Sequence, residues 1–317
     1  MKGRIKNTLF VAIGIFLFVF ALRNVELSLL WNELKGAQLV WIIFAVLAGI
    51  CSHAIRAIRW NQLLEPLGYK VSLLNAFASV MAAYVVNYAI PRSGEVLRCG
   101  MVYRANKIPI EKSLGTVFLE RVIDLLALLL ISLCIILLQF DLVVEFFSAN
   151  GMKKVPIWIF PMAIIFALAA YFFWSKVVKN WNHPLIQKIN RFIQGMMDGI
   201  GSISKLKNPV LFVVYSMLIW LGYFLSSYFT LFALAGTAHL GINAALTILF
   251  VGTVAVIITP GGTGAFHLMV AKALMLYGIS NEAVGMAYST LNHAIQMIGI
   301  FLAGAISYTI FMIKIEK

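Results

Sequence analysis

The sequence predicts an all-α integral membrane protein with six membrane-spanning helices and two re-entrant broken-helix segments arranged as an inverted repeat. Three observations predict this fold. Of the 317 residues, 62% are apolar and only 12% are charged, whereas soluble domains are about half apolar and about a quarter charged. Several apolar runs reach the roughly 20 residues that a helix needs to cross the bilayer. Two other apolar runs are interrupted by proline and glycine, which break helices.

The spanning helices are predicted from uninterrupted apolar runs. Five runs are long enough to span, and they cover residues 38–58, 115–139, 156–174, 210–235 and 283–313. A shorter run at 8–22 follows three basic residues, as the core of a signal peptide would. The sequence Arg23-Asn24-Val25-Glu26 after it offers no small-residue cleavage site. We therefore expect a retained first span.

The two broken segments cover residues 71–91 and 241–278. The first ends at Ile90-Pro91-Arg92-Ser93-Gly94, and the second is interrupted at Thr259-Pro260-Gly261-Gly262-Thr263-Gly264. Non-helical backbone at membrane depth is tolerated only where it is buried in protein or lines a watery cavity. We therefore expect two helix pairs, each of which enters and leaves the membrane on one side.

The distribution of basic residues supports this topology. With both termini inside, 19 of the 25 Lys and Arg residues, Arg56 and Arg59 among them, fall on the cytoplasmic side and four on the other, and Arg121 and Lys272 remain at membrane depth. This asymmetry follows the positive-inside rule. The net charge of +13 then reflects loops that face anionic lipid rather than nucleic acid. The sequence predicts a multi-pass protein of the cytoplasmic membrane with both termini in the cytoplasm.

The span order predicts two inverted halves, 1–140 and 156–317, within a single transmembrane domain, 1–317. Each half has the order span, span, broken segment, span, and three crossings per half make the second half inverted. Pro91 and Pro260 are 169 residues apart, and Glu120-Arg121-x-x-Asp124 has a counterpart 172 residues later in Asn292-His293-x-x-Gln296. Residues 175–209 form a basic cytoplasmic linker loop. Broken helices that meet at the midplane are a common plan of secondary transporters.

Three charged residues, Glu120, Arg121 and Asp124, lie within the run 115–139. Charges at the bilayer centre are costly, so these residues need partners. Arg121 and Asp124 are three residues apart and can pair, which leaves one negative charge. Arg92, Arg98 and Lys272 are the candidate partners for it. The result is either a buried structural ion network or the charged lining of a polar cavity.

The first break places polar residues where a lipid headgroup could bind. We expect Ser93 to cap a helix that restarts near Glu95, whose free backbone N–H groups favour an anion. Arg92 and Arg98 supply guanidinium groups suited to phosphate. With Asn87, these residues predict a site for a lipid phosphate. The alternative is that the arginines only contact headgroups non-specifically.

The second break supplies the remaining site candidates. Thr259, Gly261, Gly262 and Gly264 lack the Lys-Ser/Thr that completes a nucleotide-binding loop, but their backbone can approach a ligand closely. His267, Lys272, Asn292 and His293 follow, and the histidines are headgroup or proton-relay candidates or hydrogen-bonded structural residues. The three cysteines fit neither a disulfide framework nor a zinc site. We expect no metal and no cofactor.

Several motifs together resemble a known family. They are Arg59-Trp60, Asn87-x-x-Ile90-Pro91-Arg92-x-Gly94-Glu95-x-x-Arg98, Gly115-Thr116-Val117-x-x-x-Glu120-Arg121-x-x-Asp124 and Thr259-Pro260-Gly261-Gly262-x-Gly264. Over about residues 40–300 the chain resembles the flippase-like membrane family that includes the transmembrane region of lysylphosphatidylglycerol synthases. The resemblance implies inverted broken helices around a headgroup path, and a role in moving lipids between leaflets. We do not expect the synthase activity, because the longest polar stretch, 175–209, is too short for a catalytic domain.

These observations favour a lipid translocase that moves an anionic, aminoacylated or polyprenyl-phosphate-linked lipid between leaflets, and not an enzyme. One alternative is an intramembrane lipid-modifying transferase with Glu120 and Asp124 as acid and base. Another is a non-transporting scaffold for envelope biosynthesis that docks through 175–209. The expected partner is a membrane lipid with a phosphate headgroup and not nucleic acid. A second copy of the chain or an envelope-biosynthesis enzyme is a further candidate partner.

Overall fold

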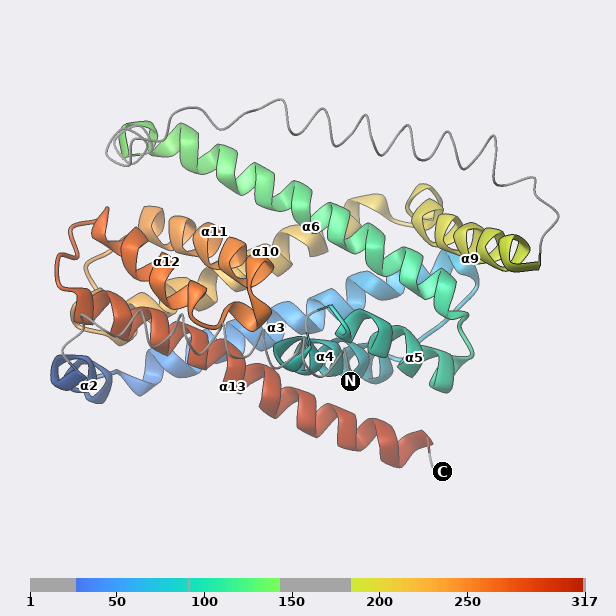
Figure 1. Cartoon of the computed structure of the whole chain (residues 1–317), viewed down its shortest axis with the longest axis horizontal. Helices are drawn as coiled ribbons and strands as arrows, with labels where there is room; N and C mark the ends of the chain where they lie inside the picture. Colours follow the sequence, from blue (N-terminus) through green and yellow to red (C-terminus); the bar gives the residue numbers. More distant parts are fainter. Residues whose placement is uncertain (1–26, 91, 143–183, 316–317) are drawn as a thin grey trace.

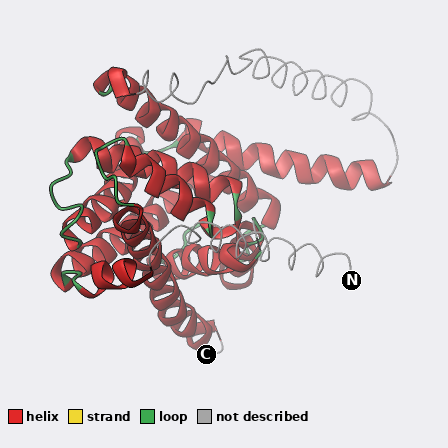
Figure 2. Cartoon of the chain, turned by 60° about the vertical axis from the view of Figure 1, so that its left-hand side comes forward, coloured by secondary structure: helices red, strands yellow, loops and turns green. Residues whose placement is uncertain are grey.

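The computed structural model describes residues 27–90, 92–142 and 184–315, and these residues form helices joined by short loops (Figures 1 and 2). The elements before residue 142 are α2 (Leu27–Lys35), α3 (Leu39–Leu64), η1 (Glu65–Leu67), α4 (Leu73–Ala89), α5 (Gly94–Asn106) and α6 (Ile110–Leu138). The elements after residue 184 are α9 (Pro184–Gly201), η3 (Ser202–Lys205), α10 (Pro209–Ala233), α11 (Ile242–Ile258), η4 (Pro260–Gly262), α12 (Ala265–Met275) and α13 (Glu282–Ile315).

Four of the described helices are long and apolar enough to cross a membrane: Leu39–Leu67, Ile110–Leu138, Pro209–Ala233 and Glu282–Lys314. They coincide with the predicted spans 38–58, 115–139, 210–235 and 283–313. Their outward side chains, such as Leu137 and Val210, are highly exposed, as expected of surfaces that face acyl chains. The prediction of an all-α integral membrane protein is confirmed. The predicted spans 8–22 and 156–174 lie outside the described residues.

Pairs of short helices that pack along each other are found at both predicted breaks. The second predicted segment, 241–278, contains both of its helices, whereas the first, 71–91, contains only α4, and α5 follows it. We call α4 and α5 hairpin 1, and α11, η4 and α12 hairpin 2 (Figure 1). Their helices have 17, 13, 17 and 11 residues, so each is roughly 16–25 Å long and shorter than the hydrocarbon core of about 30 Å. Hairpin 2 turns at Gly261 and Gly262, whose φ angles of 59° and 79° suit glycine. Helix breaks therefore lie where proline and glycine predict them.

The order long helix, hairpin, long helix occurs twice. It is formed first by α3, hairpin 1 and α6, and again by α10, hairpin 2 and α13. Both boundaries of α11 lie 169 residues after those of α4, and the same number separates Arg92 and Gly261, which both have left-handed backbone. The two helices that open the units, α3 and α10, pack closely, and the Ser52 hydroxyl donates to the Ile219 carbonyl at 2.8 Å. The inverted orientation of the halves stays a prediction.

The turned ends of the two hairpins face each other near the middle of the molecule (Figure 1). The contact is tight, because a Cβ atom added to Gly261 would lie 2.5 Å from Cδ1 of Tyr88, near the end of α4. Gly261 is therefore required for two reasons, its left-handed backbone and the ring packed on it. This contact joins hairpin 1 directly to hairpin 2.

Part of the predicted linker loop 175–209 is helical and packs against α6. The described residues from 184 form α9 and η3, and α9 lies alongside α6 (Figure 1). Glycines permit the close approach: a Cβ atom on Gly115 would lie 2.2 Å from the Met196 carbonyl oxygen. Past η3, Lys207 forms an ion pair with Glu65 at the end of α3. The described part of this segment is thus bound to its own chain.

Candidate functional site

An ionic cluster of seven side chains lies between α3, α5 and α6. Its members are Arg56, Arg59, Glu95, Arg98, Glu120, Arg121 and Asp124. Asp124 is held between two arginines of α3: Nη1 of Arg56 is 2.6 Å from Oδ2, and Nη2 of Arg59 is 3.0 Å from Oδ1. The side chains of Arg56 and Arg59 are 4% and 0% exposed. The two arginines that hold Asp124 are therefore almost completely buried.

Glu120, one turn before Asp124 on α6, joins the second half of the cluster. Its Oε2 is 2.7 Å from Nη1 of Arg98, and its Oε1 is 3.5 Å from Nη2 of Arg59. The Arg98 guanidinium also lies 3.6 Å from the centre of the Trp60 ring, a cation–π contact. Trp60 is fixed in turn, because its Nε1 donates to Thr116 Oγ1 at 2.9 Å. The Glu120–Arg98 pair is thus buried, and the Trp60 ring beside it is held in place.

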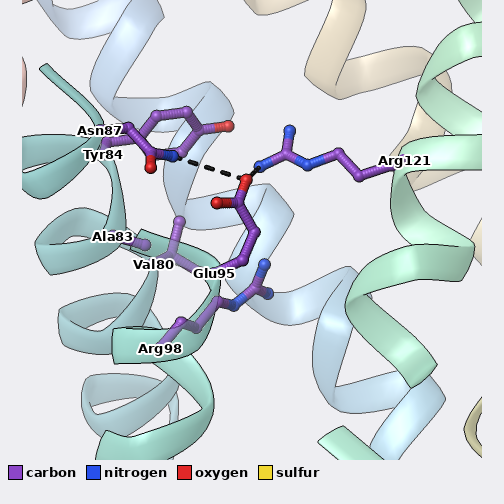
Figure 3. A pocket seen from close by; sticks show the side chains of 7 residues that line it. All are labelled: Val80, Ala83, Tyr84, Asn87, Glu95, Arg98 and Arg121. Carbon is purple, nitrogen blue, oxygen red and sulfur yellow. Dashed lines mark hydrogen bonds and ion pairs between the residues drawn. The ribbon is translucent and has the colours of Figure 1, made fainter. Parts of the chain in front are cut away.

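The open edge of the cluster is the pair of Glu95 and Arg121, drawn in Figure 3. Nη2 of Arg121 reaches from α6 to Oε1 of Glu95 at 2.8 Å, and the Asn87 amide approaches the same carboxylate from α4 (Figure 3). The Arg121 side chain is 44% exposed and that of Glu95 is 19% exposed. A cavity of about 10 Å³ adjoins them, lined also by Tyr84 and Arg98, and one water molecule would fill it. The site is closed in this conformation.

The charges of the cluster do not cancel. Four arginines face three carboxylates, which leaves one positive charge in excess among the described residues. Nε and Nη2 of Arg98 are buried and donate no hydrogen bond within this part of the chain. A buried donor without an acceptor and an unbalanced charge are both costly. An anion beside Arg98 would relieve both.

A polar network extends the cluster toward α10. Nε of Arg56 donates to the Tyr223 hydroxyl at 3.3 Å, and Tyr223 lies 3.4 Å from both the Tyr84 hydroxyl and Nδ1 of His53. These residues come from α3, α4 and α10, so the network links hairpin 1 to the pair of helices behind it.

The second predicted group of candidates gathers at hairpin 2 and carries no charged pair in the described structure. His267 and His293 lie with ring centres 5.0 Å apart, and Nε2 of His293 is 2.7 Å from the Gly261 carbonyl oxygen. Asn292 donates to the Tyr288 hydroxyl and accepts from Gln296. In the described structure, charged side chains therefore lie beside hairpin 1, whereas neutral polar groups and imidazoles lie beside hairpin 2.

Several expectations about individual residues need correction. The predicted partner Arg98 does bind Glu120, but Arg92 and Lys272 are exposed and form none of the ion pairs found in the described ranges. Arg121 binds Glu95 more closely than Asp124, from which it is 3.9 Å away. The predicted pair of Arg121 and Asp124 is therefore present, but the nearer partners of Asp124 are on α3.

The expected cap of α5 is also different. The Ser93 hydroxyl donates to the Ile90 carbonyl and makes no cap, and Oδ1 of Asn87 accepts from the Gly94 N–H at 2.8 Å instead. That N–H is therefore not free for an anion. Of the other candidates at the second break, Thr259 donates to Ala255 on its own helix, and Gly264 precedes α12 with φ 78°.

Arg56 and Arg59 belong to the cluster, but the sequence analysis did not name them as site candidates and quoted Arg59 only in the Arg59-Trp60 motif. The predicted span ended at residue 58 and assigned both to the cytoplasmic side, but α3 continues to Leu64 and buries them. A usable signal was present, because Arg56 and Arg59 are three residues apart and share a helix face. That spacing matches two arginines around one carboxylate.

Comparisons with known proteins identify the family of the chain. Residues 7–304 match the family described as the lysylphosphatidylglycerol synthase TM region. A UPF0104 membrane protein of Methanocaldococcus jannaschii is 25% identical over 197 residues, which cover 61% of this chain and 56% of that protein. No solved structure matches the chain. The chain is a multi-pass membrane protein that belongs to the lysylphosphatidylglycerol synthase transmembrane-region family.

Proposed function

We propose that this protein is a lipid translocase that moves a lipid with a phosphate headgroup between the leaflets of the cytoplasmic membrane, with both of its termini in the cytoplasm. The observation that carries the proposal is the excess positive charge of the ionic cluster, together with the unused donors of Arg98 at its cavity. A phosphate is the ligand that matches guanidinium donors in charge and geometry. The family supports a role connected with membrane lipids.

The exposed pair of Glu95 and Arg121 is the proposed entry point. This pair is less buried than the pairs behind it, so it separates more readily than they do. A phosphate that replaces the Glu95 carboxylate on Arg121 would gain the donors of Arg98 behind it. Because the cavity holds about one water molecule, headgroup entry requires hairpin 1 to move relative to α6.

The transferase and scaffold alternatives have less support. General acid–base catalysis needs a carboxyl group that is free to exchange a proton with a substrate, and each carboxylate of the cluster is already paired with at least one arginine. One side of α9, in the segment 175–209, is already occupied by its packing on α6, so only the other side, which includes Phe192 and Met197, is left for a docking partner.

The test is a leaflet assay in proteoliposomes with the full chain and phosphatidylglycerol that carries a fluorescent acyl chain. Wild-type protein should equilibrate the label between leaflets, and Arg121→Gln should slow it at least tenfold because the exposed guanidinium is lost. Arg104→Gln is the matched control, since Arg104 is exposed and lies outside the cluster. Equal rates in both variants, or a wild-type rate equal to that of protein-free liposomes, would contradict the proposal.

A further inference from the structure

The histidine pair at hairpin 2 is a second cluster of titratable groups, separate from the ionic cluster. His267 and His293 are 4% and 7% exposed, and their ring centres are 5.0 Å apart. A carbonyl oxygen only accepts hydrogen bonds, so His293 carries its proton on Nε2 and donates to Gly261. The pair therefore touches the turn of hairpin 2 directly.

Three other groups surround the histidine pair. The Phe266 ring of α12 packs on His293 with centres 5.3 Å apart. The centre of the Tyr88 ring of α4 lies 6.1 Å from that of the His293 ring. The phenol of Tyr88 is the titratable group that α4 places beside the pair. The turn contributes the Gly261 carbonyl. Tyr88 also packs against Gly261, so it contacts both the turn and the histidine pair.

Protonation and separation of the hairpins are therefore linked. Charge on an imidazole is disfavoured in a buried apolar surround, and two charged rings 5.0 Å apart would repel each other. Moving Tyr88 away from the turn of hairpin 2 would open the pair to water. A proton thus binds better to the separated arrangement, and by reciprocity acid favours that arrangement.

We propose that His267 and His293 form a proton-binding site whose protonation separates the end of hairpin 1 from the turn of hairpin 2. This property goes beyond lipid transport, because it holds for any cargo and can be measured without one. The arginines of the ionic cluster keep their charge across the physiological pH range, so they cannot supply such a response.

The experiment measures the distance between the hairpin ends as a function of pH. Nitroxide labels are attached at Ile90→Cys and Ile258→Cys, both exposed near the ends of α4 and α11, after Cys51, Cys99 and Cys134 are replaced by alanine. Pulsed electron resonance on the full chain in lipid nanodiscs then gives the distance distribution between pH 8 and pH 5. The population with the longer distance should rise on acidification, by at most about tenfold per pH unit for one linked proton.

Variants identify the histidines responsible. In the double variant His267→Gln with His293→Gln the response should disappear, and glutamine at 293 can still donate to Gly261. His239→Gln is the matched control, because His239 is exposed in the loop before α11, and it should respond as the wild type does. His53→Gln tests the other buried histidine of the described chain and should also leave the response intact.

A measurement on the wild type removes any dependence on variant folding. Nuclear magnetic resonance of nitrogen-labelled histidine reports the protonation of each ring, and at least one of the pair should titrate with the same midpoint as the distance change. A wild-type distance that does not change with pH, an unaltered response in the double variant, or histidine rings that stay neutral down to pH 5 would overturn the proposal. None of these outcomes depends on lipid transport.

Discussion

Replacing Glu120 by glutamine tests whether the ionic cluster holds the helices together as the distances suggest. Glu120 is 1% exposed and faces Arg98 at 2.7 Å and Arg59 at 3.5 Å. The substitution keeps the shape of the side chain but removes its charge, which raises the excess charge of the cluster from one to two. Breaking a buried pair by removing one partner costs about 3–5 kcal/mol, because the remaining charge is left uncompensated.

A surface pair provides the matched comparison. Glu65 binds Lys207 at the end of α3, with side chains that are 38% and 74% exposed, and exposed pairs contribute about 0–1 kcal/mol. Glu65→Gln should therefore lower the free energy of unfolding by about 1 kcal/mol or less. Adding Arg98→Met to Glu120→Gln should recover part of the loss, since it removes the orphaned charge. Recovery will be partial because Arg98 also packs on Trp60.

The assay is reversible unfolding of the full chain in mixed micelles, followed by helical circular dichroism as the denaturing detergent increases. The difference between Glu120→Gln and Glu65→Gln should be at least about 2 kcal/mol. If the two variants lose the same stability, the buried pairs do not stabilise this fold, and the role assigned to Glu120 and Arg98 is wrong.

Two glycine substitutions, measured in the same assay, test the close contacts. Gly261→Ala should lower the free energy of unfolding by about 1–3 kcal/mol more than Gly278→Ala does. Both glycines have positive φ, but only Gly261 contacts the Tyr88 ring. Equal losses would contradict the contact between the hairpins. Gly115→Ala should lower the free energy of unfolding by about 1–3 kcal/mol, because the new methyl group overlaps a backbone carbonyl of α9. Gly100→Ala should raise it by up to about 1 kcal/mol, because its methyl group meets nothing within 4 Å and alanine favours the helix. If Gly115→Ala stabilised the protein as Gly100→Ala is expected to do, α9 would not pack on α6.

The sequence predicts the helices and their breaks well, because hydropathy and proline-glycine clusters act locally. The break in hairpin 2 falls at Pro260 and Gly261, as expected, and α10 and α13 begin within one residue of the predicted spans. The end of α3 was predicted too early, since a hydropathy pattern cannot separate a charged loop from a helix turn whose arginines are buried against carboxylates.

The partners within the site are harder to predict, because they depend on how helices pack. Asp124 and Arg56 are 68 residues apart in the chain and 2.6 Å apart in the structure. The local sequence correctly suggested that one of the two carboxylates, Glu120 or Asp124, needs an external partner, and Arg98, which binds Glu120, was among the candidates. It could not show that Asn87 rather than Ser93 would cap α5, since that choice depends on the turn between the two helices.

The most direct test of the central claim is lipid binding to the purified full chain, measured by native mass spectrometry. The claim is that the excess positive charge beside hairpin 1 binds a phosphate headgroup. We predict that phosphatidylglycerol is retained at least tenfold more strongly than diacylglycerol with the same acyl chains, and that Arg121→Gln removes most of this preference while Arg104→Gln does not. Equal retention of the two lipids by the wild-type protein would contradict the claim.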